Sequence, residues 1–177
     1  THNPAAEELI NICNEKGILV VEEMFDGWQN AKNGNNNDYA RFFKQTIGES
    51  NQILGKENGM TWAKYDLTAA VKRGWNAPSI IMWSLGNEVQ EGATGVLTQA
   101  YANVQANLID WTTALDTTRP ATRGDNVLKG NKIGIPKNMM DAMTTANGTV
   151  GLNYCSGNDY DTLHNSNPNW KLYGSET

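Results

Sequence analysis

Residues 79–84 read SIIMWS, a short and almost continuous apolar run directly after Pro78. Proline stops the helical pattern of residues 62–75, in which Leu67, Ala70, Val71 and Gly74 share one side. An apolar run of this length between helices is typical of a strand buried on both faces of a parallel sheet. Residues 96–115 follow as the strongest helical pattern, because their large apolar residues recur at spacings of four and three. The segment therefore predicts a helix–strand–helix unit.

The same alternation extends in both directions along the chain. Asn3 and Pro4 are suited to begin a helix that ends at Gly17. Further strands are predicted at residues 18–21, 121–123, 150–154 and 171–174, with weaker helices between the last three. Alternating helices and strands indicate an α/β fold with a parallel sheet. The Asn- and Gly-rich residues 24–60 form a long loop, of the kind that often serves as a functional lid.

Composition narrows the classes of function. Of the 177 residues, 39% are hydrophobic and 19% charged, as in ordinary globular proteins. The net charge of -5 and the scattered lysines and arginines argue against nucleic-acid binding, which needs a clustered basic face. No run of 18 apolar residues predicts a membrane span. A neutral or weakly polar small molecule is the ligand that this composition favours.

The two cysteines, Cys13 and Cys155, are interpreted as free buried thiols, with one disulfide as the alternative. They do not distinguish a cytoplasmic from a secreted protein. The chain shows no signal peptide, yet it opens on Thr1 and His2 without a methionine and stops at Thr177 directly after a strand-like run. We therefore expect it to be a segment of a larger protein, so the compartment stays open.

Polar residues follow each of the five predicted strands. Ligands of parallel α/β folds bind at the carboxyl ends of strands. Two carboxylates from different strands meeting at one mouth are what glycoside cleavage needs, because one protonates the leaving oxygen and the other attacks the anomeric carbon. Acidic residues after strands also serve as helix caps or ion-pair partners, and spacing alone favours that alternative. The residues concerned are Glu22, Glu23, Asp26, Asn87, Glu88, Arg123, Asp125, Asn153, Tyr154, Ser175 and Glu176.

Four blocks of sequence, in this order, resemble one known family. They are THNP at 1–4 with GILVVEE at 17–23, FDGW at 25–28, PSIIMWSLGNE at 78–88 and LYGSET at 172–177. The third closely resembles the acid/base signature of glycoside hydrolase family 2, which groups β-galactosidases, β-glucuronidases and β-mannosidases. The last resembles the nucleophile strand of that family. The resemblance implies a catalytic (β/α)8 barrel, and it is more specific for the family than for the β-galactosidase branch.

The resemblance also implies roles for seven residues. Glu88 would be the general acid/base and Glu176 the nucleophile of a retaining hydrolase that acts on terminal β-galactosides. Asn87 would bind the sugar 2-hydroxyl, and Tyr154 would lie beside the nucleophile. His2, Asp26 and Trp28 match positions that contact the sugar. Simpler alternatives exist for Tyr154 as a core aromatic, for His2 as a neighbour of the helix start, and for Trp28 as a packing residue.

Other features of the sequence assign less. Glu22 or Glu23 is expected to pair with Arg123 as support for the site, and Trp83 is expected to pack in the barrel. No cluster has zinc-ligand spacing, and neither a Gly-rich phosphate loop nor a nucleophile elbow is present. The sequence requires no cofactor, although a divalent cation is left open.

A complete barrel has eight strands in about 250 residues. Five strands are predicted here, so residues 1–177 are expected to form one catalytic barrel domain that is incomplete at both ends. The expected partners are a carbohydrate substrate and the remaining domains of the same enzyme, with a homo-oligomer left open. Two alternatives remain: a β-glucuronidase or β-mannosidase of the same family, and a non-catalytic carbohydrate-binding remnant of the barrel.

Overall fold

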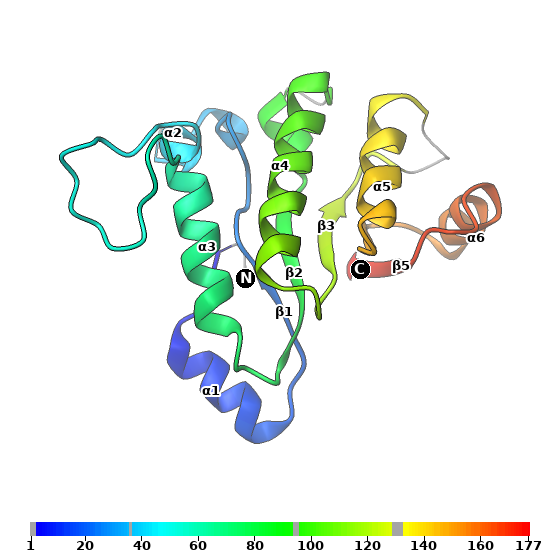
Figure 1. Ribbon diagram of the computed structural model, residues 1–177. Coiled ribbons are helices and arrows are strands. Elements are labelled where there is room, and N and C mark those ends of the chain that lie inside the picture. The colour runs from blue at the N-terminus through cyan, green and yellow to red at the C-terminus, as the bar shows by residue number, and fades with distance from the viewer. Residues whose placement is uncertain (1–2, 36, 94–95, 129–132) are drawn as a thin grey trace.

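The computed structural model describes residues 3–35, 37–93, 96–128 and 133–177. Within these ranges the chain forms one parallel sheet with the strand order β1-β2-β3-β4-β5 (Figure 1). The strands are β1 (Val20–Glu23), β2 (Ile80–Asn87), β3 (Ala121–Asp125), β4 (Val150–Asn153) and β5 (Leu172–Glu176). The α-helices are α1 (Glu7–Lys16), α2 (Ala40–Phe43), α3 (Trp62–Gly74), α4 (Gln99–Leu115), α5 (Ile135–Thr145) and α6 (Gly157–Ser166). Two 3-10 turns, η1 (Lys32–Gly34) and η2 (Val89–Ala93), complete the elements.

The strands run side by side in chain order, with helices covering one face of the sheet (Figure 1). Each neighbouring pair is parallel, with Ser84 opposite Glu23 and Thr122, and Asn153 opposite Glu176. The carboxyl ends of all five strands therefore lie along one edge of the sheet. This arrangement is part of a (β/α)8 barrel, as the sequence predicts.

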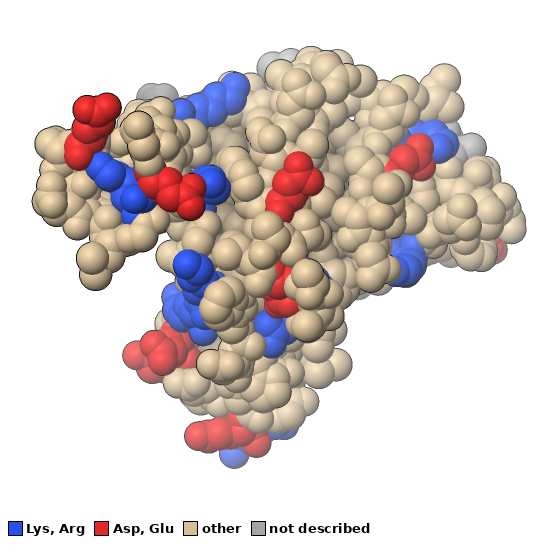
Figure 2. Space-filling model, viewed as in Figure 1, with Lys and Arg blue, Asp and Glu red and all other residues tan. Residues whose placement is uncertain are grey.

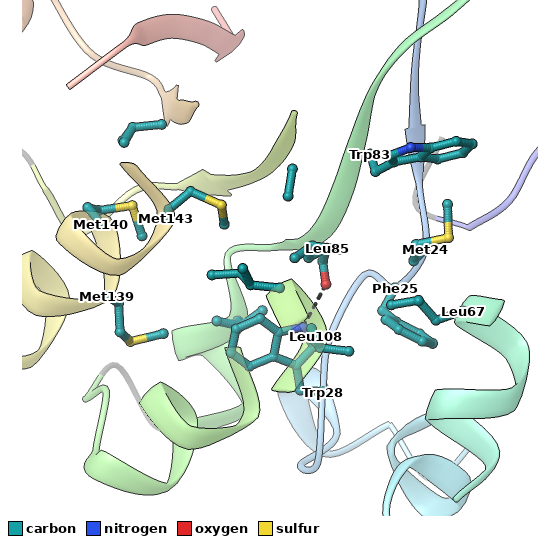
Figure 3. Packing of buried hydrophobic residues seen from close by; sticks show 14 of the residues in the cluster. Met24, Phe25, Trp28, Leu67, Trp83, Leu85, Leu108, Met139, Met140 and Met143 are labelled. Atoms are coloured by element: carbon teal, nitrogen blue, oxygen red, sulfur yellow. Dashed lines mark hydrogen bonds between the residues drawn. The ribbon is translucent and has the colours of Figure 1, made fainter. Parts of the chain in front are cut away.

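The core lies between the sheet and the helices (Figure 3). Trp83 of β2 is fully buried and lies against α3, where a Cβ atom added to Gly74 would come within 2.6 Å of its ring. Glycine at position 74 thus lets α3 approach β2 closely. The indole Nε1 of Trp83 donates to Asp116 at 2.9 Å, so Trp83 is a packing residue as expected. Four residues predicted to share one side of α3, namely Leu67, Ala70, Val71 and Gly74, are all buried.

The start of α1 differs from the prediction. The helix begins at Glu7 with Ala6 at its N-cap, and Asn3 and Pro4 precede it in irregular backbone. The reason is a tertiary contact, because the Glu22 carboxylate accepts from the Ala5 amide at 3.0 Å and Arg73 donates to the Ala5 carbonyl at 2.8 Å. Residues before the helix are therefore held against β1 and α3 instead of continuing the helix.

The first strand also begins later than predicted. Gly17 ends α1 in the left-handed region with φ 68°, and the Ile18 amide donates to the Cys13 carbonyl. Ile18 and Leu19 belong to this turn and are 52% and 68% exposed. The apolar run at 18–21 is therefore not a strand buried on both faces; only its second half enters β1.

The long loop at 24–60 contains more structure than its sequence suggests. It includes η1, α2 and an isolated bridge between Thr46 and Thr61. Phe25 anchors its beginning by stacking on Tyr39 at 5.5 Å between ring centroids and by an edge contact with Phe43 at 5.2 Å. The part after α2 extends away from the sheet beside α3 (Figure 1).

Two further expectations concern the cysteines and the surface. Neither cysteine forms a disulfide, as interpreted from the sequence. Cys13 is buried as expected, whereas Cys155 is only half-buried. Acidic and basic side chains are interspersed on the helix-covered face, and no large single-sign patch appears there (Figure 2). In the part of the chain that the structure describes, none of the helices has the length and apolarity needed to cross a membrane.

Candidate active site

The edge formed by the carboxyl ends of the strands carries the two candidate carboxylates. Glu88 directly follows β2, and Glu176 is the last residue of β5. The Glu88 amide donates to the Gly124 carbonyl at 3.0 Å, which continues the pairing of β2 with β3. Glu88 itself has φ 44°, in the left-handed region that side chains other than glycine rarely adopt. Such local strain occurs often at functional sites, because the surrounding structure must hold the residue in place.

Glu88 is buried, with 8% of the residue exposed. Its Oε1 accepts a hydrogen bond from Asn153 Nδ2 at 3.0 Å. Burial is the main cause that raises the pKa of Glu88 above its ordinary value. The hydrogen bond from Asn153 works in the opposite direction, whereas the carboxylates of Glu91 and Glu176 raise the pKa further.

Glu176 has a different environment. Its Oε2 accepts a hydrogen bond from the Tyr154 hydroxyl, and its backbone carbonyl accepts from the Tyr154 amide at 2.8 Å. Tyr154 is 55% exposed and has φ 55°, so the site contains a second residue in the left-handed region. The hydrogen bond that the Tyr154 phenol donates to Glu176, together with the negative charge of that carboxylate, raises the pKa of Tyr154 to about 12. The expected contact between Tyr154 and Glu176 is present.

Asn87 precedes Glu88 in the chain and holds Asp26 beside the end of β2. The Asn87 amide donates to the Asp26 carbonyl at 3.1 Å, and Asn87 Oδ1 accepts from Asn153 at 2.8 Å. The Asp26 carboxylate accepts from Lys32 Nζ at 2.6 Å, and the same ammonium lies 3.9 Å from Glu91. The beginning of the long loop is therefore fixed beside the end of β2 and the turn that follows it.

Trp28 lies in the core and not at an open surface. It is 1% exposed, and its Nε1 donates to the Leu85 carbonyl at 2.8 Å (Figure 3). Its ring stacks on that of Tyr101, with 6.1 Å between the ring centroids. The structure thus gives Trp28 the packing position that the sequence left as the alternative. His2 lies outside the described residues.

The expected pairing of Arg123 with Glu22 or Glu23 is wrong. Arg123 and Asp125 are both fully buried on the α4 side of β3 and form an ion pair at 2.6 Å. Arg123 Nε also donates to Gln105 Oε1 at 3.1 Å. Glu22 instead contacts Arg73 at 3.3 Å, and Glu23 accepts from Ser84 Oγ at 2.7 Å. Glu23 points to the opposite face of the sheet from Arg123, because successive residues of a strand alternate between faces. Glu22 shares the helix-covered face with Arg123, but its strand β1 is separated from β3 by β2.

Sequence reasoning gave no role to several residues that the structure brings to the site. Asn153, Ser175, Glu91 and Lys32 all contact the candidate residues or their neighbours. In the sequence, Asn153 and Ser175 are recognisable only as polar residues beside Tyr154 and Glu176. No sequence pattern around Lys32 or Glu91 predicts their place at the site. Among the described residues, no group of three or more His, Cys, Asp or Glu side chains could hold a metal ion.

Known proteins resemble this chain in sequence and in fold. Residues 1–165 match the family model "Glycosyl hydrolases family 2, TIM barrel domain". The chain belongs to this family. The match ends at residue 165 and therefore leaves out β5 and Glu176. The similarity to a solved structure covers these residues as well. A solved structure of a glycosyl hydrolase family 2 member from Bacteroides cellulosilyticus superposes on all of this chain with a TM-score of 0.75 and 31% identity, over 19% of its own length.

The curated relatives include proteins named beta-galactosidase and proteins named beta-glucuronidase. A beta-galactosidase of Bacteroides ovatus is 35% identical over 109 residues, which are 62% of this chain and 11% of that protein. A putative beta-glucuronidase of Formosa agariphila is 30% identical over 124 residues, which are 70% of this chain and 9% of that protein. The chain thus spans about a tenth of the length of these relatives.

Proposed function

We propose that the complete protein carrying this chain is a retaining glycoside hydrolase that cleaves terminal β-galactosides. The observation that carries the proposal is the pairing of two carboxylates with different environments at one edge of the sheet. Glu88 is buried with a raised pKa, whereas Glu176 accepts a hydrogen bond from the Tyr154 hydroxyl. A buried carboxyl group with a raised pKa is suited to act as the acid, and a carboxylate at the same edge is suited to act as the nucleophile.

In the proposed reaction, Glu88 donates its proton to the glycosidic oxygen while a Glu176 oxygen attacks the anomeric carbon. The bond to the leaving alcohol breaks, and a covalent glycosyl-enzyme forms on Glu176. Glu88, now ionised, then takes a proton from a water molecule that attacks the same carbon and releases Glu176. The raised pKa of Glu88 supports this role, because the group must be protonated in the first step.

Neighbouring residues receive supporting roles. Asn87 would donate to the sugar 2-hydroxyl, a contact that strengthens in the transition state. Tyr154 would steady the charge of Glu176, and Asp26 and His2 would contact the sugar. We do not extend this role to Trp28, because its ring is buried. The remaining parts of the barrel and its accompanying domains are the proposed partners of this chain.

A second function, β-glucuronide cleavage, is favoured by the names of relatives such as the one from Formosa agariphila. The two activities share the carboxylate pair and differ in the group at sugar carbon 6. Assays of the complete polypeptide on nitrophenyl galactoside, glucuronide and mannoside separate them. We expect turnover of the galactoside to exceed that of the other two; preference for the glucuronide would replace our sugar assignment and leave the reaction unchanged.

The nucleophile is tested by labelling. A 2-fluoro galactoside with a good leaving group should trap a covalent adduct, and peptide mass spectrometry should locate it on Glu176. Glu176→Gln should remove the adduct, whereas Glu15→Gln, a change of an exposed carboxylate on α1, should not. Labelling of a different residue would overturn the assignment. Binding of galactosides without adduct or turnover would instead support the non-catalytic alternative.

The acid is tested by the leaving group. Glu88→Ala should lower kcat/KM by about 10²- to 10⁴-fold on a substrate whose alcohol needs protonation. The loss should be much smaller for a dinitrophenyl leaving group, because that phenolate departs without a proton. An equal loss on both substrates would contradict the acid role of Glu88.

A further inference from the structure

Asn153, the last residue of β4, is fully buried beside the candidate acid Glu88. Its Nδ2 donates to Asn87 Oδ1 at 2.8 Å and to Glu88 Oε1 at 3.0 Å. Its Oδ1 accepts from Ser175 Oγ at 2.5 Å. One carboxamide thus connects the end of β2 with the end of β5, across the intervening strand β3.

Glu88 fixes which way the carboxamide faces. An ionised carboxylate only accepts hydrogen bonds, so the nitrogen of Asn153 must point toward Glu88 and its oxygen toward Ser175, whose hydroxyl donates to it. Each hydrogen of Nδ2 then has one acceptor. A buried amide with its donors and its acceptor engaged has little freedom to rotate, because any other orientation leaves buried polar atoms without partners.

Gly124 of β3 makes this bridge sterically feasible. A Cβ atom at position 124 would lie 2.6 Å from Asn87 Oδ1 and 3.0 Å from Asn153 Oδ1. Any side chain there would push the two amides apart. The absence of a side chain on the middle strand therefore allows residues of β2 and β4 to meet.

We propose that Asn153 is a positioning residue, which orients the Glu88 carboxyl group and Asn87 together and couples them through Ser175 to the strand that carries Glu176. The inference rests on the proposed function for its catalytic meaning. Asn153 is buried behind the residues proposed to touch the substrate and acts through them.

The bridge also affects protonation. A hydrogen bond donated to a carboxylate favours its ionised form, so Asn153 lowers the pKa of Glu88 against the effect of burial. Other groups that face Glu88 are Glu91 from η2, Glu176 from β5 and the phenol of Tyr154 after β4. Glu91 and Glu176 raise the pKa of Glu88, whereas the hydrogen bond from Asn153 lowers it.

Asn153→Asp tests the proposal with almost no change of shape. An aspartate cannot donate to Glu88 when ionised, and its charge disfavours the Glu88 carboxylate, so the pKa of Glu88 should rise. Because Glu88 must be protonated to act as the acid, the alkaline limb of the pH–rate profile should move to higher pH. We expect kcat/KM to fall by about 10- to 100-fold, since a hydrogen bond to a charged group is lost. Asn153→Ala removes the donor without adding a charge and should shift the limb less.

Ser175→Ala adds a second test of the same bridge. Without the hydroxyl, the Asn153 oxygen loses its donor and the carboxamide is held less firmly against Glu88, so a smaller shift in the same direction is expected. Asn167→Asp is the matched control, because Asn167 is a buried asparagine at the end of α6 whose Nδ2 donates to the Leu163 carbonyl at 3.1 Å. This variant should keep the wild-type profile.

Carboxyl-carbon NMR titration of Glu88, assigned with Glu88→Gln, reads the same effect without turnover. A rise of the Glu88 titration in Asn153→Asp supports the positioning role even if the protein proves inactive, in which case only the proposed function fails. An unchanged titration and an unchanged alkaline limb in a folded Asn153→Asp protein would overturn the inference while leaving the hydrolase intact.

Discussion

Tyr154 and Glu176 are joined twice: the Tyr154 hydroxyl donates to Glu176 Oε2, and the Tyr154 amide donates to the Glu176 carbonyl at 2.8 Å. The backbone contact extends the pairing of β4 with β5 by one residue. The left-handed conformation of Tyr154, with φ 55°, accompanies the turn of the chain away from the sheet. Backbone pairing and side-chain contact therefore fix the phenol and the carboxylate in one arrangement.

This pair predicts a change in tyrosine ionisation. The Glu176 carboxylate holds the pKa of Tyr154 at about 12. Glu176→Gln removes the charge, so the pKa of Tyr154 should fall toward the ordinary value of about 10. NMR titration of the phenolic carbon, assigned with Tyr154→Phe, measures the shift. Glu15→Gln should leave it unchanged, and an unaltered pKa in Glu176→Gln would contradict the contact.

Trp28 is expected to matter for stability. Trp28→Phe removes the hydrogen bond to the Leu85 carbonyl and part of the stack on Tyr101. We expect the free energy of unfolding to fall by about 1–3 kcal/mol. Urea denaturation measures the loss, with Trp75→Phe as control because Trp75 is 44% exposed. Equal losses in the two variants would show that the burial of Trp28 contributes nothing.

The buried pair of Arg123 and Asp125 predicts a strong asymmetry between single and double variants. Asp125→Ala leaves the Arg123 guanidinium fully buried without its counter-ion and should lower the free energy of unfolding by about 3–5 kcal/mol. Replacing both residues with apolar side chains of similar volume should be less harmful, because no charge remains buried. Urea denaturation of the single variant and of Arg123→Met with Asp125→Leu tests this, and a double variant less stable than the single one would refute it.

Asp116 predicts how stability responds to acid. Burial by itself would raise its pKa, but hydrogen bonds from Thr118 and from Trp83, with the charge of Arg119, lower it to about 2. The folded-state pKa is below the unfolded value, so Asp116 contributes stability above about pH 4 that is lost as the pH falls toward 2. The contribution is about 2 kcal/mol by linkage. Asp116→Asn should flatten the unfolding free energy in this window; a curve parallel to wild type would exclude the effect.

Several features of the fold follow from the sequence alone. Short apolar runs and helical spacing predicted the five strands in order, and residues such as Leu67 and Val71 were assigned correctly to the buried side of α3. The positions of Glu88 and Glu176 after strands predicted that they share one edge, because parallel strands align their carboxyl ends. These features are local or follow from a topology that allows few alternatives.

Other features depend on contacts between residues far apart in the chain. The start of α1 is set by Glu22 and Arg73, the partner of Arg123 by the face of β3 from which it projects, and the burial of Trp28 by Leu85 and Tyr101. Asn153 meets Asn87 across 66 residues of sequence. Periodicity records which side chains share a face of one element, whereas these pairings require the distance between elements, and only the folded chain determines that distance.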